Sequence, residues 1–180
     1  LVVLKKINDR TPMKNDFTLH TPRLSLSVPT DADIDAIFAI HSDARTYEHR
    51  PELAMKSREE ATELARSWQT NWCEKQLGYY VVSTLDGTTI GFTGVRHSEE
   101  AGKEVLNLYY RFAPESQGKG YAKEAAAAAI ASARERFPQL PVLAIIDPTN
   151  KASIALALKL GLQHVPGAGV PNDYEVYRLD

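Results

Sequence analysis

The residues with the clearest capacity for chemistry lie between Leu106 and Glu124, where an apolar run ends at a proline and a glycine-bearing turn follows. This turn, residues 117–122 (Gln-Gly-Lys-Gly-Tyr-Ala), opens an alanine-rich stretch with helical composition. The first N–H groups of a helix lack internal partners and carry partial positive charge. Glycines let a phosphate approach the backbone closely. We call residues 117–122 the phosphate loop, because the sequence predicts that it binds a phosphate-bearing molecule.

Three kinds of phosphate-binding loop can be compared with this turn. A P-loop needs two glycines five positions apart followed by Lys and Ser or Thr, and the sequence has no such string. A dinucleotide fingerprint needs a third glycine where Lys123 stands and an acidic residue near position 140, which is Leu. The third pattern, Gln/Arg-x-x-Gly-x-Gly/Ala, is met by Gln117, Gly120 and Ala122.

The third pattern resembles the coenzyme A loop of the GNAT superfamily of acyl-CoA-dependent N-acetyltransferases, in particular its RimJ/RimL-like branch. Other segments carry the same resemblance: the opening Thr21-Pro22-Arg23-Leu24, the strand exit at 110–115, the Asn150-x-x-Ser153 helix start, and the helix end Leu158-Lys159-Leu160-Gly161-Leu162. The resemblance covers roughly residues 21–180, so it spans a whole domain.

Periodicity and the resemblance predict the same organisation of the chain. Alternation and apolar runs predict strands at 23–28, 79–84, 90–96, 104–113, 142–146, 162–165 and 173–178. Helices are predicted after Thr30, after Ser57, over 120–137 and over 150–160. The fold class is α/β, with a mixed, mostly antiparallel central sheet flanked by helices. The resemblance implies a GNAT-like single domain over 21–180, splayed fourth and fifth strands, and an N-terminal extension over 1–20.

The resemblance implies acetyl-CoA as the co-substrate. Its pyrophosphate would meet the N–H groups of the phosphate loop, that is, of Gln117, Gly118, Lys119, Gly120, Tyr121 and Ala122. The pantetheine arm would pair with the fourth strand at Phe112 and Ala113, and Pro114, which has no N–H, would end that strand. Asn150 and Ser153 would contact the pantetheine, although Asn150 is also a good helix N-cap.

The implied reaction is direct transfer of the acetyl group to a neutral primary amine, with a backbone N–H near Phe112 polarising the carbonyl. Many family members supply a Tyr where this chain has Ala157, and an acidic residue where it has Asn107. Ser153, Tyr110 and Glu48 are the substitutes that we predict for catalysis.

The acceptor is predicted to be an N-terminal α-amine or a small-molecule amine. Deprotonating a lysine side chain costs about 3.6 kcal/mol more than deprotonating an α-amine, and the sequence shows no obvious base. Loops at 44–56 and 165–173 are expected to shape the acceptor pocket. Two alternatives stay open: a non-catalytic acyl-CoA-binding or sensing module, and a transferase that uses another acyl-CoA.

Composition limits the partners. A net charge of −2 argues against nucleic acid, and no apolar run reaches the roughly 20 residues of a membrane span. The single Cys73 fits a reducing cytoplasm, and the five histidines lack metal-ligand spacing, so no metal site is predicted. A homodimer is expected by resemblance alone.

Overall fold

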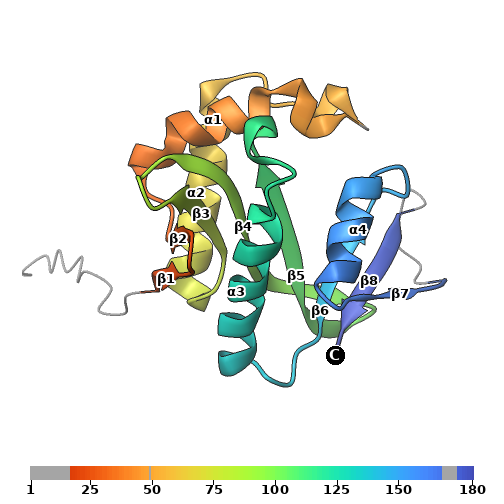
Figure 1. The fold of residues 1–180 in the computed structure, drawn as a ribbon. Coiled ribbons are helices and arrows are strands. Elements are labelled where there is room, and N and C mark those ends of the chain that lie inside the picture. Colours follow the sequence, from red (N-terminus) through yellow and green to blue (C-terminus); the bar gives the residue numbers. More distant parts are fainter. Residues whose placement is uncertain (1–16, 49, 168–173) are drawn as a thin grey trace, which may run out of the picture.

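The computed structural model describes residues 17–48, 50–167 and 174–180. Within these residues one sheet holds eight strands in the order β1-β2-β3-β4-β5-β6-β8-β7 (Figure 1). The strands are β1 (Leu19–His20), β2 (Leu24–Ser27), β3 (Tyr79–Thr84), β4 (Thr89–Glu100), β5 (Lys103–Phe112), β6 (Val142–Ile146), β7 (Gln163–Val165) and β8 (Glu175–Leu179). All neighbouring pairs are antiparallel except β5 with β6, so the predicted mixed sheet is confirmed.

The helices are α1 (Ile34–Ser42), α2 (Arg58–Lys75), α3 (Tyr121–Arg136) and α4 (Lys151–Lys159), with 3-10 turns η1 (Asp31–Asp33), η2 (Ala44–Tyr47), η3 (Pro51–Leu53) and η4 (Pro114–Ser116). Alternate residues of β3 divide the core between the two faces of the sheet. Tyr79 and Val81 pack with α1 and α2, whereas Tyr80 and Val82 pack with residues of α3. The pair α3 and α4 lies in front of the sheet in Figure 1.

The alanine-rich helix α3 owes its close approach to the sheet to its small side chains. Ala125, Ala126, Ala129 and Ala133 are all almost fully buried. Their burial brings the helix backbone near β4 and β5, with which α3 makes contact. This packing of helix on sheet fixes where the first turn of α3 lies.

The hairpin that joins β4 to β5 is longer than the sequence indicated. We predicted that the first strand ends at Arg96, but β4 continues to Glu100 and pairs with β5 from Lys103 onward. The connecting residues Ala101 and Gly102 have φ values of 48° and 75°. Positive φ at both central residues is what a tight two-residue hairpin needs. The polar residues 97–100 are therefore strand residues because of their cross-strand partners.

The central sheet opens between β5 and β6. These parallel strands pair only at Leu106 with Val142 and Asn107 with Leu143. Beyond these pairs β5 continues to Phe112 and β6 to Ile146 without pairing with each other. The predicted splay of the family's fourth and fifth strands, here β5 and β6, is confirmed.

Some predictions fall at or beyond the limits of the described residues. The extension predicted over 1–20 and the loop predicted over 165–173 lie largely outside them. Within the extension, Leu19 and His20 form β1 and pair with Leu26 and Ser25, so the sheet begins before residue 21.

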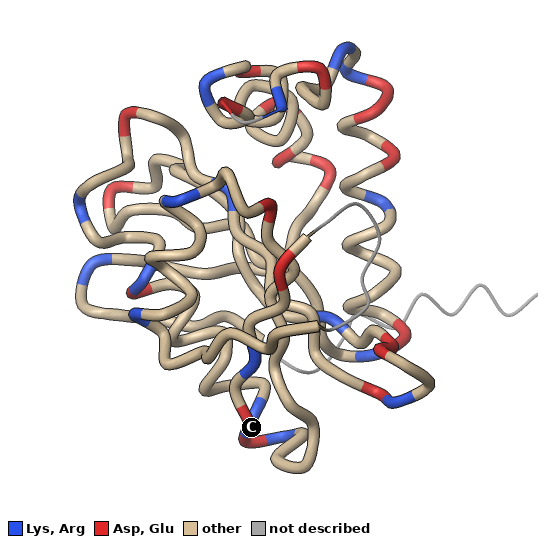
Figure 2. Tube along the Cα trace, turned by 90° about the vertical axis from the view of Figure 1, so that its right-hand side faces the viewer, with Lys and Arg blue, Asp and Glu red and all other residues tan. Residues whose placement is uncertain are grey.

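No helix in the described part of the chain is long and apolar enough to cross a membrane. Lys and Arg are interspersed with Asp and Glu along the chain (Figure 2).

Candidate active site

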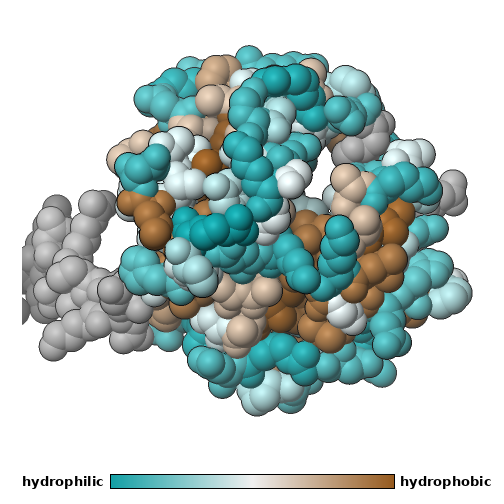
Figure 3. Space-filling model, viewed as in Figure 1, coloured by the Kyte–Doolittle hydropathy of each residue, from teal (hydrophilic) through white to brown (hydrophobic). Residues whose placement is uncertain are grey.

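The splay between β5 and β6 forms one end of a cleft of about 710 Å³. The space-filling view shows a hollow between the two halves of the molecule, with hydrophobic surface beside it (Figure 3). The cleft brings together predicted site residues from four segments of the chain, namely Glu48, Tyr110, Phe112, Gln117, Gly118, Gly120, Tyr121, Ala122, Asn150 and Ser153. Among the predicted residues, Ala113 and Lys119 do not line it.

The backbone of β5 presents an unpaired edge to this cleft. Leu106 donates its N–H to the Pro141 carbonyl on the β6 side, and Ala113 donates its N–H to the Ile90 carbonyl on the β4 side. Because backbone groups alternate in direction along a strand, Tyr110 and Phe112, which lie beyond the last residues paired with β6, direct their N–H groups away from β4 and toward the splay. This edge offers the N–H groups of Tyr110 and Phe112 to the cleft.

This geometry corrects one predicted contact. Phe112 and Ala113 were both expected to pair with the pantetheine arm. The N–H of Ala113 has a partner in Ile90, at 2.9 Å, so it cannot serve in a ladder with a ligand. Phe112 keeps its predicted position on the free edge, and its carbonyl oxygen accepts a hydrogen bond from the Gln117 side chain at 3.3 Å. The sequence could not settle this, because the direction of the Ala113 N–H depends on its pairing with Ile90 in the folded sheet.

The phosphate loop lies at the N-terminus of α3, where its sequence predicted it. Gly118 and Gly120 have φ values of 72° and 78°, a conformation that other residues adopt at a cost. The first helical N–H bond in this turn runs from Glu124 to the Gly120 carbonyl. Within the described residues, the N–H groups of residues 118–123 donate to no protein acceptor. The loop and the first turn of α3 therefore offer a group of free donors at the positive end of a helix.

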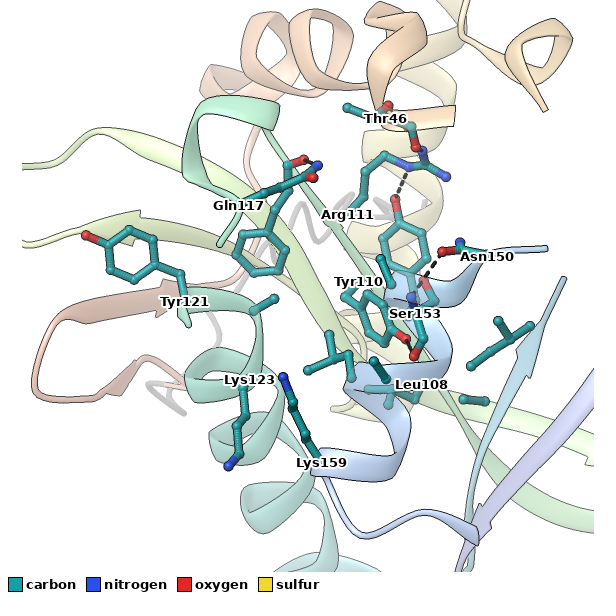
Figure 4. Close-up of a pocket in the computed structure, with 18 of the residues that line it drawn as sticks. Thr46, Leu108, Tyr110, Arg111, Gln117, Tyr121, Lys123, Asn150, Ser153 and Lys159 are labelled. Carbon is teal, nitrogen blue, oxygen red and sulfur yellow. Dashed lines mark hydrogen bonds between the residues drawn. The ribbon is translucent and has the colours of Figure 1, made fainter. Parts of the chain in front are cut away.

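Helix α4 contributes the polar groups opposite the loop (Figure 4). Asn150 caps the helix, since its Oδ1 accepts from the Ser153 N–H at 3.0 Å, and its amide nitrogen remains available to a ligand. The Tyr110 hydroxyl donates to the Ser153 carbonyl oxygen at 2.9 Å. Burial raises the pKa of Tyr110 to about 12, against the smaller effect of a hydrogen bond with the Ser153 side chain.

The two positions where the family often carries catalytic side chains hold neither acid nor base. Ala157 carries no hydroxyl and is fully buried in the core, so this position cannot supply the acid that a Tyr supplies in many family members. Asn107 donates its side-chain amide to the Tyr79 hydroxyl at 3.3 Å. Glu48, the predicted alternative, is an exposed residue that lines the cleft just after η2.

A polar network that the sequence did not predict lies on the other side of β5. The Tyr109 hydroxyl is 2.7 Å from His41 Nε2 and 3.3 Å from Arg111 Nε. Arg111 also donates to the Thr46 carbonyl at 2.6 Å, and its guanidinium lies 3.5 Å from the centre of the Tyr47 ring. These contacts attach η2 to β5 and so fix one wall of the cleft. A helix face, a strand and a loop meet here, and no local pattern in the sequence indicates that meeting.

An ion pair ties the next loop to the end of β6. Arg50 Nε lies 3.0 Å from an oxygen of Asp147, which is buried. Hydrogen bonds from the Thr149 hydroxyl and backbone, together with one from Arg50, lower the pKa of Asp147 to about 2. Asp147 therefore stays ionised, and it is a structural anion rather than a base at neutral pH. Among the described residues, no group of three His, Cys, Asp or Glu side chains is placed to hold a metal ion.

Comparison with known proteins decides the family. The model of the acetyltransferase (GNAT) domain matches residues 23–163. The chain belongs to the GNAT acetyltransferase family. Among curated proteins it is similar to YkkB of Bacillus subtilis (strain 168), at 29% identity over 155 residues that cover 81% of this chain and 85% of YkkB. The uncharacterised N-acetyltransferase YoaA of the same strain is 26% identical over 172 residues, covering 89% of this chain and 95% of YoaA.

Solved structures agree with this GNAT assignment. The acetyltransferase from Agrobacterium tumefaciens str. C58 has a TM-score of 0.78 at 25% identity, over 91% of this chain and 94% of that one. RimL, a ribosomal L7/L12 α-N-protein acetyltransferase solved with coenzyme A, has a TM-score of 0.70 at 15% identity, over 88% and 95% of the two chains. At that identity the likeness to RimL shows the fold alone.

Proposed function

We propose that this GNAT acetyltransferase transfers an acetyl group from acetyl-CoA directly to a primary amine. One observation carries the proposal: the free edge of β5 leads to the unpaired N–H groups at the start of α3, within one cleft. A free strand edge suits the amides of the pantetheine arm, and a helix N-terminus suits the pyrophosphate. The coenzyme A in the RimL structure supports the same co-substrate class.

The chemistry needs three contributions from the protein. A neutral amine nitrogen attacks the thioester carbon, and the C–S bond breaks as the C–N bond forms. The nitrogen then loses one proton, and the thiolate takes up one proton. We assign polarisation of the carbonyl to a backbone N–H of the free edge near Phe112. We assign to the Ser153 hydroxyl, which lines the cleft, a hydrogen bond to the departing thiolate, whereas the Tyr110 hydroxyl donates to the Ser153 carbonyl oxygen.

The acceptor in this proposal is an α-amine or a small-molecule amine. Asp147 is fixed as an anion by Thr149 and Arg50, which leaves Glu48 as the carboxylate of the cleft wall able to receive a proton. An exposed carboxylate is a weak base, so an amine that is partly neutral at pH 7 is favoured. Glu48 is also placed to attract the positively charged form of an incoming amine.

The first test is binding of acetyl-CoA by isothermal calorimetry, with Gly118→Asp as the disabling variant. An Asp side chain at this position would bring a negative charge to the N–H groups that receive the pyrophosphate, so at least a tenfold loss of affinity is expected. Gly102→Asp is the matched control, because Gly102 has a φ of 75° against 72° for Gly118, and a Cβ at either site meets no atom within 4 Å. Equal loss in both variants, or no binding by the unmutated protein, would refute the proposal.

A second candidate is a non-catalytic acyl-CoA-binding or sensing module, and the burial of Ala157 favours it, because the usual acid is missing. Release of free thiol from acetyl-CoA in the presence of a broad panel of amines separates the two. Tight binding without release on any amine would support the sensing module and exclude the transferase.

A further inference from the structure

The segment just before β2, with Thr21 and Arg23, is joined to the first turn of α3 by a set of contacts centred on Glu124. Glu124 lies in the first turn of α3. Its carboxylate accepts from the Thr21 hydroxyl at 2.6 Å and from the Arg23 backbone N–H at 3.1 Å. The Arg23 guanidinium completes the set, with Nε and Nη2 at 2.7 and 2.6 Å from Oε2. Residues about 100 positions apart in sequence are therefore linked by four polar contacts.

The charge of Glu124 conflicts with the ligand that α3 would bind. A carboxylate in the first turn of a helix is favourable in itself, because the N-terminus is partially positive. The same terminus would receive the pyrophosphate, and Glu124 lies about one turn, or roughly 5.4 Å of rise, from Gly120. Unneutralised, it would repel the phosphates. Partial burial raises the pKa of Glu124, but the hydrogen bonds from Thr21 and Arg23 outweigh burial and hold that pKa below its usual range.

Arg23 acts on the loop backbone as well as on Glu124. Its Nη1 donates to the Lys119 carbonyl oxygen at 3.0 Å, and its guanidinium lies 4.7 Å from the centre of the Tyr121 ring. The carbonyl and the N–H of one trans peptide unit point in opposite directions. Holding the Lys119 carbonyl toward Arg23 therefore aims the Gly120 N–H away from Arg23, and Gly120 lines the cleft.

We propose that Arg23 is a positioning residue for the co-substrate: it neutralises Glu124 and orients the Lys119–Gly120 peptide, so that the N-terminus of α3 can accept the pyrophosphate of acetyl-CoA. The inference rests on the proposed function, since it needs acetyl-CoA at this loop. Thr21 and Arg23 thus have a role in co-substrate binding at a loop that lies about one hundred residues further along the chain.

The test compares the acetyl-CoA affinity and steady-state kinetics of Arg23→Gln, Arg23→Lys, Glu124→Gln and the double variant Arg23→Gln/Glu124→Gln. Arg23→Gln leaves the Glu124 charge unpaired and is expected to raise the KM for acetyl-CoA about tenfold. The kcat and the KM for the amine should change less than twofold. Arg23→Lys keeps the positive charge and should recover most of the loss. Glu124→Gln alone should bind at least as well as the unmutated protein.

The double variant separates electrostatics from simple loss of structure. If repulsion by Glu124 causes the defect, removing its charge should restore the KM of Arg23→Gln to within about threefold of the unmutated value. A double variant as weak as Arg23→Gln, or an Arg23→Lys variant as weak as Arg23→Gln, would overturn the proposal. Arg58→Gln is the matched control, because it breaks an exposed arginine–carboxylate pair with Asp35 on another face, and it should change no kinetic constant.

Failure of this inference can be told apart from failure of the proposed function. If the unmutated protein binds no acetyl-CoA, the function itself is wrong. If it binds acetyl-CoA and Gly118→Asp abolishes that binding, the function stands and the Arg23 variants test the inference alone. Thermal unfolding of each variant without ligand identifies any that fail to fold, and Arg23→Lys then carries the comparison.

Discussion

Tyr110 and Ser153 lie together in the cleft, but they hold their protons differently. The Tyr110 hydroxyl donates to a backbone carbonyl and has a pKa of about 12, whereas the leaving thiol has a pKa of about 8.5, like that of cysteine. Proton transfer from Tyr110 to the thiolate would therefore run uphill, and transfer from the Ser153 hydroxyl more so, because an aliphatic hydroxyl is a weaker acid than a phenol. We expect Tyr110→Phe to lower kcat less than threefold and Ser153→Ala to lower it about tenfold, because the Ser153 hydroxyl would stabilise the departing thiolate by a hydrogen bond without giving up its proton.

Single-turnover rates with saturating acetyl-CoA measure this directly, because they exclude product release. Ala152→Ser, one position before Ser153 on the cleft wall, is a control for a small change in side-chain size on α4. A loss of a hundredfold or more in Tyr110→Phe would assign stabilisation of the leaving thiolate to Tyr110 instead of Ser153.

At the residue scale the sequence indicated the phosphate loop and Asn150 but not the partners of either. Glycine spacing is a local pattern, and the demand for positive φ at Gly118 and Gly120 follows from it. The contact between Arg23 and Glu124 joins residues about 100 positions apart, and nothing local in either segment predicts it. The same holds for the N–H of Ala113, whose direction depends on the register with Ile90.

Elements α1 and β5 meet through a buried histidine whose protonation affects stability. His41 Nδ1 lies 2.8 Å from the Ile37 carbonyl oxygen, so it must carry a proton, and the neutral ring then accepts at Nε2 from the Tyr109 hydroxyl. Burial lowers the pKa of His41 from 6.5 to about 4, against the effect of the Ile37 bond. The folded protein therefore disfavours protonation of this ring, while the unfolded chain accepts it readily.

The sign of the pH dependence follows from this difference. Between about pH 4 and 6.5 the unfolded state binds more protons at His41, so the stabilisation present above pH 6.5 is lost as the pH falls toward 4. From pH 7.5 to 5.0 we expect a loss of about 2 kcal/mol from this group. Urea unfolding of the unmutated protein and of His41→Gln at both pH values measures it. Between these pH values the free energy of unfolding of His41→Gln should fall by about 2 kcal/mol less than that of the unmutated protein. An equal fall in both proteins would contradict the assignment to His41. His164→Gln, at an exposed strand position, is the control.

At the element scale the sequence indicated every helix and most strand positions, because apolar periodicity and end signals are local. It missed the extent of the β4–β5 hairpin, since residues 97–100 are polar and their strand conformation comes from pairing with residues 103–106. The splay between β5 and β6 came from the family resemblance alone. A strand's sequence does not state where it parts from its neighbour, and the two pairs at Leu106 and Asn107 are visible only in three dimensions.

For the molecule as a whole, the cleft is formed where two halves of one sheet separate, and each half supplies a different function. The half with β5 and α3 offers the backbone donors for the co-substrate, and the half with β6 and α4 supplies Asn150 and Ser153. The pair Arg50–Asp147 spans from the η2–η3 region to the end of β6, so it links the two halves beside the cleft. An acceptor amine would enter past η2, whose residues Arg45 and Thr46 line the cleft with Glu48.

The proposed acceptor class rests on the shortage of strong bases among the described residues at that entrance. An α-amine with a pKa of about 7.8 is roughly one-tenth neutral at pH 7, whereas a lysine side chain with a pKa of about 10.4 is almost wholly charged. We therefore expect a peptide with a free N-terminus and no lysine to show at least tenfold higher kcat/KM at pH 7 than an N-terminally blocked peptide with one lysine. The higher nucleophilicity of lysine reduces the full difference in neutral fraction, so tenfold is a lower bound.

The pH profile distinguishes this explanation from a pocket that excludes lysine by shape. If amine ionisation decides the preference, the advantage of the α-amine should shrink as the pH rises from 7 to 9, because the neutral fraction of lysine rises tenfold per pH unit while that of the α-amine saturates. A preference that stays constant over this range would assign selectivity to pocket shape. Faster acetylation of lysine at pH 7 would instead require a base in the cleft, and Glu48→Gln would then abolish the activity on lysine while leaving acetyl-CoA binding intact.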